Sequence, residues 1–332
     1  MIAFLLKIRY RIEYLLCLFL YAVLRVLPEG VALRAGGLFG GLLYHAVPLR
    51  RRTGLVNLEI AFPDVPERER RRILRKSLSN LGRVIVSIGL LPTFTDDEIR
   101  RRVSYSEGSL ENLRKASEKG KGLFFVTAHI GNWELLALAH SLHGHPFSVF
   151  ARRRSNPHLE RIIENLRTRG GNVVITAQEM KAEGARELIG ALRKGGAIGI
   201  LVDQAPRGPH GVLVPFFGKL AWTLRVPALL ALRTGAALVP AFLRPHPSEQ
   251  GRYLIYFGPE IPKIDSGDRD EDVRKLSEQL QGVIEAEVRA RPEEWFWVHR
   301  RWKRSPDLVD PYPAPVLRTW RRSRRSRGAS SA

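Results

Sequence analysis

The sequence predicts an α/β fold with a mostly parallel central sheet flanked by helices. From residue 103 to about 258, short apolar runs of strand length alternate with longer amphipathic stretches, which is the pattern of repeated strand–helix units. The chain has 332 residues, of which 44% are hydrophobic, so it can bury a sizeable core in one large domain or two small ones.

Residues 1–49 are predicted to form a hydrophobic N-terminal membrane anchor. A basic start, Lys7 to Arg11, precedes an uncharged apolar run from Tyr14 to Leu24. This run is short for a spanning helix, which needs about 20 residues, but a slightly extended and tilted helix could insert. A buried core helix and a secretory signal peptide are the alternatives. We find no small-residue cleavage motif after Leu24, which favours a retained anchor whose basic flank stays in the cytoplasm.

The rest of the chain is divided by composition. Residues 50–101 are helical in pattern and basic, and residues 305–332 form a proline- and arginine-rich tail that is expected to be disordered. Between them lie the alternating elements, and residues 50–304 together are expected to form the functional domain. The expected helices are 109–118, 132–143, 157–169, 181–194, 222–234 and 270–290, and the expected strands are 123–128, 147–150, 172–175, 197–202, 236–243 and 252–257.

The chain is strongly basic. Its 54 Lys and Arg residues against 33 Asp and Glu residues give a net charge of +21. Such a charge indicates an anionic partner, which could be a lipid surface, nucleic acid or an acidic substrate. The arginine clusters in 50–76 are either a solvated helical face or a surface that lies on lipid headgroups. A nucleic-acid-binding protein is a distant alternative, because the hydrophobic N-terminus argues against it.

The stretch GLFFVTAHIGNWELL at 122–136 is the candidate active site. A buried strand leads into a turn with His129, and Glu134 falls in the first turn of the next helix. Ligands of open α/β sheets bind at the carboxyl ends of the strands. A histidine there can act as a general base, and a carboxylate five positions on can fold back to orient its imidazole. Because this spacing is unspecific, a capping or core histidine beside an ordinary first-turn glutamate is the alternative.

No metal and no cofactor is expected. The single cysteine, Cys17, excludes an intrachain disulfide framework and a cysteine-based metal cluster. His140, His143 and His145 lie close together in the sequence, but no acidic residue accompanies them, so packing or surface roles are favoured over metal binding.

Five segments together carry a resemblance to a known family. The segments are NLEIAFP at 57–63, HIGNWE at 129–134, ARRRSNPHLE at 151–160, ILVDQAPRGPHGVLVPFFG at 200–218 and EEWFWVHRRWKR at 293–304. With them the chain resembles the late, lauroyl/myristoyl-type acyltransferases of lipid A synthesis, within the lysophospholipid acyltransferase superfamily. The resemblance covers nearly all of residues 1–304. Its tryptophan-rich last block is the most specific, and the arginine-rich tail after residue 317 departs from the family.

The resemblance implies a glycerolipid-acyltransferase-like fold and an O-acyltransferase at the cytoplasmic face of the bacterial inner membrane. Such an enzyme would move a fatty acyl chain from an acyl carrier protein or acyl-CoA thioester to a hydroxyl of a lipid A precursor. His129 and Glu134 would be its catalytic dyad. Another glycolipid or a lysophospholipid is the alternative acceptor, because it would use the same dyad.

Four further residues are expected to bind substrate. Backbone amides around Gly131 and Asn132, at a helix N-terminus, are candidate donors to a tetrahedral oxyanion. Arg152 and Asp203 each follow a strand, so they are expected at the same sheet edge as His129. Arg152 could bind a phosphate of the acceptor or of the donor's phosphopantetheine arm. Asp203 could position an arginine or the acceptor, with a loop-capping role as the alternative.

The tryptophans of the last block are expected to be divided between two environments. Trp295, Trp297 and Trp302 interleave with basic residues, a composition that suits a membrane interface and also the stacking of nucleic-acid bases. At helical spacing, part of the set would instead face inward. We therefore expect some of these side chains in the core and others at lipid headgroups.

Overall fold

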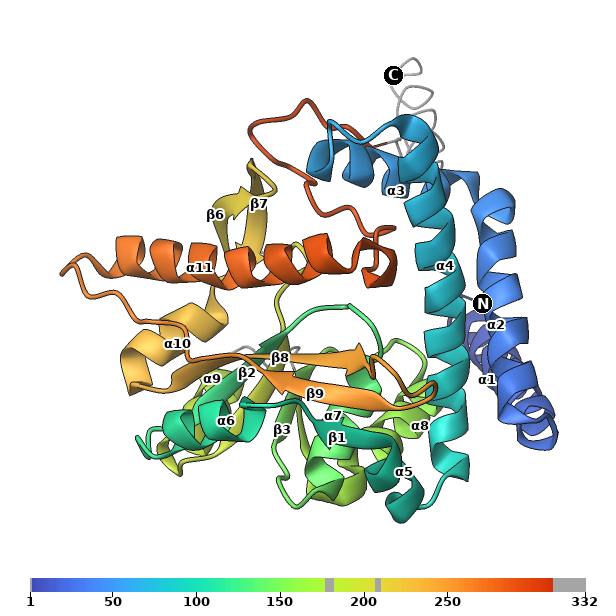
Figure 1. Ribbon diagram of the computed structural model, residues 1–332, viewed down its shortest axis with the longest axis horizontal. Coiled ribbons are helices and arrows are strands. Elements are labelled where there is room, and N and C mark those ends of the chain that lie inside the picture. Colours follow the sequence, from blue (N-terminus) through green and yellow to red (C-terminus); the bar gives the residue numbers. More distant parts are fainter. Residues whose placement is uncertain (1, 177–181, 207–209, 313–332) are drawn as a thin grey trace, which may run out of the picture.

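The computed structural model describes residues 2–176, 182–206 and 210–312. A seven-stranded sheet in the order β1-β9-β8-β2-β5-β3-β4 forms the centre of the molecule (Figure 1). Only the β8–β9 pair is antiparallel within this sheet, which confirms the mostly parallel prediction. The strands are β1 Val103–Tyr105, β2 Leu123–Thr127, β3 Ser148–Ala151, β4 Val173–Thr176, β5 Ala197–Leu201, β8 Ala237–Pro245 and β9 Tyr253–Phe257.

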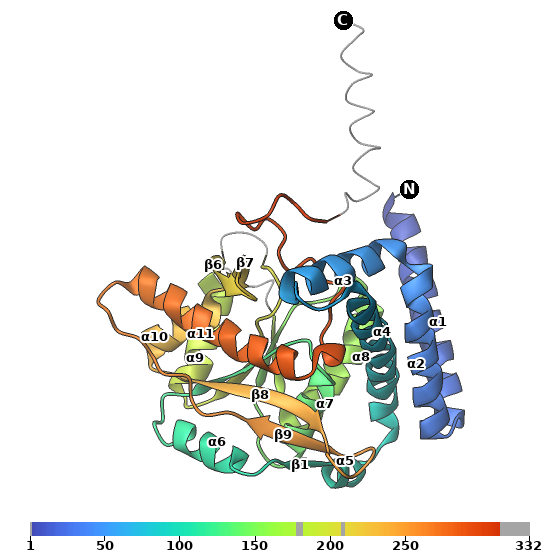
Figure 2. The ribbon, with the colours of Figure 1, turned by 45° about the horizontal axis from the view of Figure 1, so that its top comes forward.

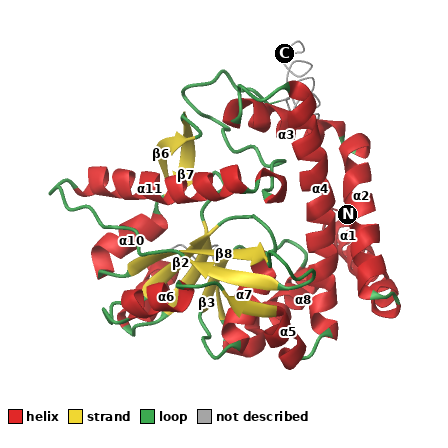
Figure 3. Cartoon of the chain, viewed as in Figure 1, coloured by secondary structure: helices red, strands yellow, loops and turns green. Residues whose placement is uncertain are grey.

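Helices cover both faces of the sheet (Figure 3). Successive residues of β2 point to opposite faces, so Phe124 and Val126 enter one core cluster, with α9, α10 and α11, while Leu123 and Phe125 enter the other, with α6 and α7. The helices are α1 Ile2–Val26, α2 Glu29–Ala46, α3 Pro48–Ala61, α4 Glu67–Leu90, α5 Asp96–Arg102, α6 Ser109–Ser117, α7 Trp133–Leu142, α8 Pro157–Thr168, α9 Ala182–Arg193, α10 Val226–Thr234 and α11 Arg269–Ala290, with short 3₁₀ turns at Leu91–Thr93, Arg169–Gly171 and Pro292–Glu294.

Helices α1 and α2 lie along α4 at one side of the sheet (Figure 2). The backbones of α2 and α4 approach closely because both carry glycine at the crossing. A Cβ on Gly36 would lie 2.8 Å from the carbonyl oxygen of Gly82, and a Cβ on Gly40 would overlap the carbonyl of Leu78. Residues with side chains at Gly36 or Gly40 would therefore force these helices apart.

The membrane-anchoring helix expected within residues 1–49 is not supported. Among the described helices, none combines the length and the apolar character needed to cross a membrane. The physical reason is composition: α1 carries charged residues throughout its first half and at Arg25, and α2 is rich in glycine and partly buried against α4.

A two-stranded antiparallel hairpin, β6 Gly211–Phe216 and β7 Lys219–Leu224, was not expected from the sequence. The helix predicted at 222–234 begins only at Val226, because Trp222 and Thr223 pair with β6 instead. Pro227 lies in the first turn of α10, where its missing N–H costs no hydrogen bond. The short edge strand β1 was also missed. Residues 313–332 of the predicted tail lie outside the described residues.

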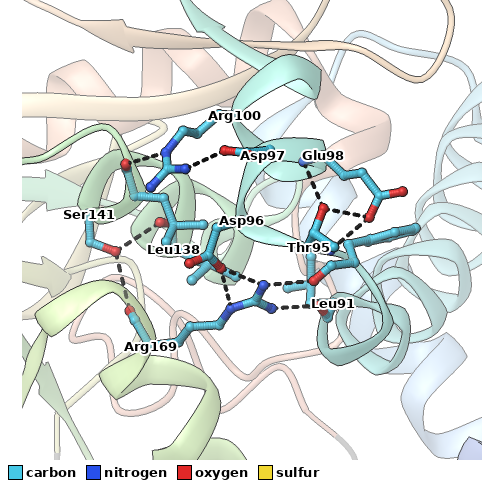
Figure 4. Close-up of polar contacts among 11 residues, drawn as sticks. Leu91, Thr95, Asp96, Asp97, Glu98, Arg100, Leu138, Ser141 and Arg169 are labelled. Carbon is cyan, nitrogen blue, oxygen red and sulfur yellow. Dashed lines mark hydrogen bonds and ion pairs between the residues drawn. The ribbon is translucent and has the colours of Figure 1, made fainter.

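The corner between α4 and α5 is held by polar contacts to the end of α7 and to the 3₁₀ turn after α8 (Figure 4). The guanidinium of Arg169 donates to the carboxylate of Asp96 and to the carbonyl oxygens of Leu91 and Phe94, at 2.7–2.9 Å. Thr95 and Glu98 form a reciprocal capping box at the start of α5. These bonds fix the end of α4, and α4 forms one wall of the site described next.

Candidate active site

His129 and Asp203 meet at the carboxyl edge of the sheet. The strands β2 and β5 are parallel neighbours in which Thr127 pairs with Leu201, and each of the two side chains lies two residues beyond that pair. The imidazole Nδ1 of His129 lies 2.8 Å from Asp203 Oδ1, and the backbone N–H of His129 donates to Oδ2 at 3.0 Å. Two contacts to one carboxylate fix both the backbone and the ring of His129.

Asp203 is only 1% exposed, so its charge depends on its donors. Trp295 Nε1 donates a third hydrogen bond, to Oδ2, at 2.9 Å. Burial alone raises the pKa of Asp203, but the charge of His129 and the hydrogen bonds from His129 and Trp295 outweigh it and lower the pKa to about 2. Asp203 is therefore an ionised carboxylate at neutral pH.

The C-terminal aromatic–basic segment, residues 293–304, forms backbone hydrogen bonds with the turn that carries His129. Trp295 and Ile130 form an antiparallel bridge, the amide of Phe296 donates to the carbonyl of His129, and the amide of Gly131 donates to the carbonyl of Glu294. Trp295, Trp297 and Trp302 are all buried, so the expected share of these side chains at lipid headgroups is wrong, and the set belongs to the core.

Glu134 does not contact the imidazole of His129. Its carboxylate is 6% exposed and binds the guanidinium of Arg167, with Oε2 3.0 Å from Nε and Oε1 2.5 Å from Nη2. The physical reason is the packing of α8 against α7, which brings Arg167 to the first turn of α7. The orienting contact expected from Glu134 is made by Asp203.

Gly131 and Asn132 shape the turn. Gly131 has a φ of 56°, which favours glycine, and because its amide is bonded to Glu294 it is not a free donor to an oxyanion. Asn132 caps α7 by accepting from the amide of Leu135, and its Nδ2 donates to Ser87 Oγ of α4.

Arg152 is exposed in the loop after β3, and no hydrogen bond joins it to His129 or Asp203 among the described residues. The same loop holds the N-terminal helix. Asn156 caps α8 because its Oδ1 accepts a hydrogen bond from the amide of His158. Its Nδ2 donates to the carbonyl of Tyr10 and to the carboxylate of Glu13, both on α1 and both at 3.0 Å. The loop thus connects the sheet edge to α1.

Trp133 lines two cavities, and His129 lines the wider of the two. The wider cavity has a volume of about 510 Å³ and lies between α4 and the β8–β9 hairpin, with His129 in its wall. The narrower one has a volume of about 50 Å³ and lies between the sheet and α7. The indole of Trp133 packs edge-on against the imidazole, with the ring centroids 4.9 Å apart.

In the described parts of the chain, no three His, Cys, Asp or Glu side chains are grouped to hold a metal ion. The predicted histidine cluster is used for packing: His140 Nδ1 lies 2.9 Å from the Tyr105 hydroxyl, and His143 Nε2 lies 2.7 Å from the carbonyl oxygen of Val103.

These features define an α/β enzyme with an oriented imidazole in the wall of a cavity. The family described as bacterial lipid A biosynthesis acyltransferase matches residues 2–304, and the chain belongs to this family of acyltransferases.

Three similar proteins extend over most of the chain. A lipid A biosynthesis lauroyltransferase of Escherichia coli K12 is 28% identical over 85% of this chain and 89% of its own length. A lipid A biosynthesis acyltransferase of Haemophilus influenzae is 27% identical over 86% of this chain and 88% of its own length. A lipid A biosynthesis palmitoleoyltransferase of E. coli K12 is 24% identical over 84% of this chain and 87% of its own length.

Proposed function

We propose that the protein moves a fatty acyl chain from a thioester donor, acyl carrier protein or acyl-CoA, to a hydroxyl of a lipid A precursor. The observation that carries the proposal is the imidazole of His129, which Asp203 orients and which lies in the wall of the wider cavity. Membership of the family and the names of the similar proteins support the choice of acceptor.

In this proposal His129 is the general base. Asp203 accepts the hydrogen bond at Nδ1, so Nδ1 carries the proton of the neutral ring. Nε2, which lies 3.4 Å from the side-chain amide of Gln204, then takes the acceptor's proton. The acceptor oxygen forms its bond to the thioester carbon as that proton leaves. When the tetrahedral intermediate collapses, the carbon–sulfur bond breaks and the imidazolium returns the proton to the departing thiolate. Asp203 stabilises the imidazolium between these two steps.

Glu134 has a structural part in this scheme. The ion pair with Arg167 joins the first turn of α7 to α8, and α7 begins directly after the turn that carries His129. We propose that Glu134 maintains the position of α7. The amides of Trp133 and Glu134 are candidate oxyanion donors, because those of Leu135 and Leu136 are bonded to Asn132. Arg152, on the loop beyond β3, is proposed to meet the phosphate of a substrate that enters from the sheet edge.

We further propose that the protein works at the cytoplasmic face of the inner membrane, with residues 1–49 as its lipid contact and 50–304 as the acyltransferase domain. The support is a set of exposed apolar side chains on α1 and α2, beside a net charge of +21 that suits anionic lipid. On α2 the exposed set includes Leu38, Phe39 and Leu42, at 63–72% exposure.

The test is acyl transfer by the purified protein, followed by mass spectrometry of the product. A lipid A precursor, a different glycolipid and a lysophospholipid are offered in parallel with acyl carrier protein and CoA donors. The proposal expects a mass increase of one acyl chain on the lipid A precursor. His129→Ala is expected to lower the rate by about 10²–10⁴-fold. His145→Ala, an exposed histidine outside the site, is the matched control. Full activity of His129→Ala, or acylation of another acceptor alone, would refute the assignment.

A further inference from the structure

We propose that Arg301 is a positioning residue whose buried positive charge balances the carboxylate of Asp203 and keeps the imidazole of His129 neutral, ready to accept a proton, near pH 7. This inference rests on the proposed function, because it treats His129 as the base of an acyl transfer. Arg301 acts at a distance, since its side chain is 0% exposed and lines neither of the two cavities.

Arg301 is a buried cation without a carboxylate at its guanidinium. The group lies over the ring of Phe216, with Cζ 4.8 Å from the ring centroid. Among the described residues, no carboxylate is hydrogen-bonded to the guanidinium, and its Nε has no hydrogen-bond partner. Taking an unpaired charge out of water is costly, so packing alone does not account for an arginine at this position.

Neutral oxygen atoms fix the guanidinium of Arg301. Nη1 donates to the carbonyl oxygen of Trp222 at 2.6 Å, and Nη2 donates to Thr223 Oγ1 at 2.8 Å. Nη2 also donates to Gln281 Oε1 at 2.9 Å. The first two acceptors belong to β7 and the third to α11. Hydrogen bonds to neutral acceptors hold the group in one orientation and leave its full charge in place.

Gln281 connects this guanidinium to the backbone beside Asp203. Its Oε1 accepts from Arg301, and its Nε2 donates to the carbonyl oxygen of Val202 at 3.1 Å. Two hydrogen bonds and one carboxamide therefore separate Arg301 from the residue that precedes Asp203. Burial lowers the pKa of Arg301 to about 10 and the charge of Asp203 acts in the opposite direction, so Arg301 is a cation at neutral pH.

The two buried charges act on His129 in opposite directions. A carboxylate beside an imidazole favours the imidazolium, which cannot accept a proton, whereas a cation in the same region favours the neutral ring. General base catalysis needs a ring that is neutral at the working pH and still basic. With Asp203 ionised and Arg301 charged, the buried cluster has no net charge until His129 takes the proton of the acceptor.

The other charged or titratable groups around His129 do not supply this balance. Burial lowers the pKa of His299 to about 4, so this residue of the same segment is neutral near pH 7. Arg50 of α3 and Arg83 of α4 are exposed, and solvent screens their charges. The remaining groups are paired: Glu294 with Arg291, Glu134 with Arg167, and Glu249 with Arg252 and His246.

The test is the pH dependence of kcat/KM for acyl transfer by Arg301→Met. Removing a unit charge at roughly 10 Å, with an effective dielectric constant of about 20, should move the acid limb of the profile upward by about one pH unit. On this limb the rate should fall about tenfold at each pH, while the rate on the alkaline plateau changes little.

Two controls separate charge from structure. Arg300→Met removes the same charge one residue away, where the guanidinium lies over the ring of Tyr312, and should leave the profile unchanged. Thr223→Val removes one acceptor of the Arg301 guanidinium but keeps its charge. Its acid limb should therefore stay at the wild-type pH, whatever happens to its stability.

A second variant covers the case in which Arg301→Met does not fold. Gln281→Glu places a carboxylate where the Gln281 oxygen lies, 2.9 Å from Nη2 of Arg301, and cancels the cation in place. This variant is expected to move the acid limb in the same direction as Arg301→Met.

Direct titration of His129 distinguishes this inference from the proposed function. NMR of protein labelled at the histidine rings gives the midpoint at which His129 takes up a proton, with its signal identified by its loss in His129→Gln. The midpoint should rise by about one pH unit in Arg301→Met and in Gln281→Glu. An unchanged midpoint overturns the inference, even where the rate falls equally at every pH, and leaves the proposed function intact. If the wild-type protein transfers no acyl group, the proposed function fails, and the NMR midpoints alone decide the role of Arg301.

Discussion

The indole nitrogen of Trp295 donates a hydrogen bond to Asp203, 92 residues earlier in the chain, at 2.9 Å. The bond joins the buried aromatic–basic segment to the carboxylate that orients His129. The amide of Phe296 and the carbonyl of His129 are bonded beside it. The C-terminal segment is therefore part of the framework that positions His129.

Trp295→Phe should lower kcat while KM for both substrates changes little. The phenyl ring keeps most of the packing but removes one of the three donors to a buried charge, which is worth about 1.5–3 kcal/mol, or roughly 10–150-fold. Steady-state kinetics measure this split. Trp297→Phe is the matched control, because the indole of Trp297 donates to the carbonyl of Pro292 and not to the site. Equal losses in the two variants would mean that packing alone is responsible.

Asp203→Asn should reduce kcat by about 10²–10⁴-fold without unfolding the protein. The amide cannot favour the tautomer with the proton on Nδ1 or stabilise the imidazolium. Turnover in single-cycle assays, with the fold verified by circular dichroism, measures the effect. A rate near that of wild type would exclude Asp203 as the partner of His129.

Arg167→Met should destabilise the fold more than the double variant Arg167→Met with Glu134→Leu. Removing the guanidinium alone leaves a buried carboxylate without its partner, at a cost of about 3–5 kcal/mol, and replacing both charges relieves most of it. Chemical denaturation gives the free energies of unfolding. If the double variant were less stable by the sum of the single losses, the two residues would be energetically independent.

The free energy of unfolding should fall as the pH falls from about 6.5 to 5. Because the pKa of His140 drops from 6.5 to about 3 on burial, the folded state binds fewer protons than the unfolded state in this window. Each pH unit then costs up to about 1.4 kcal/mol from this residue. Denaturation curves of His140→Gln should show a shallower dependence on pH. Identical slopes would show that His140 does not stay neutral in the fold.

Substituting Leu38, Phe39 and Leu42 together by Gln should weaken binding to anionic lipid vesicles by at least about tenfold, because each side chain contributes apolar area to the contact. Vesicle sedimentation measures the partition. Leu110→Gln is the control, since Leu110 is an exposed leucine on α6, away from α1 and α2. Unchanged partition of the triple variant would rule out α2 as the lipid contact.

The sequence was sufficient for six of the seven strands of the sheet and for the place of His129 after β2, because the strand–turn–helix pattern around Leu123–Val126 depends on local hydrophobic periodicity. It was not sufficient for the partner of His129. Local spacing favoured Glu134, but the order of strands places β5, and with it Asp203, beside β2. The order of parallel strands follows from long-range packing, which a single sequence does not display.

Two other differences have the same origin. The helix expected at 222–234 begins only at Val226, because Trp222 and Thr223 belong to β7 and pair with residues of β6. The tryptophans of the last block carry a composition typical of a lipid interface, but Asp203 and the carbonyl oxygens of Pro292 and Phe216 satisfy their indole nitrogens inside the core.

The close crossing of α2 and α4 at Gly36, Gly40 and Gly82 limits how far the N-terminus can be truncated without exposing α4. Ser87 of α4 accepts a hydrogen bond from Asn132, which caps α7 beside the turn that carries His129. A recombinant fragment that starts at residue 50 would leave this surface of α4 bare, so expression trials should retain the chain from Glu29 onward.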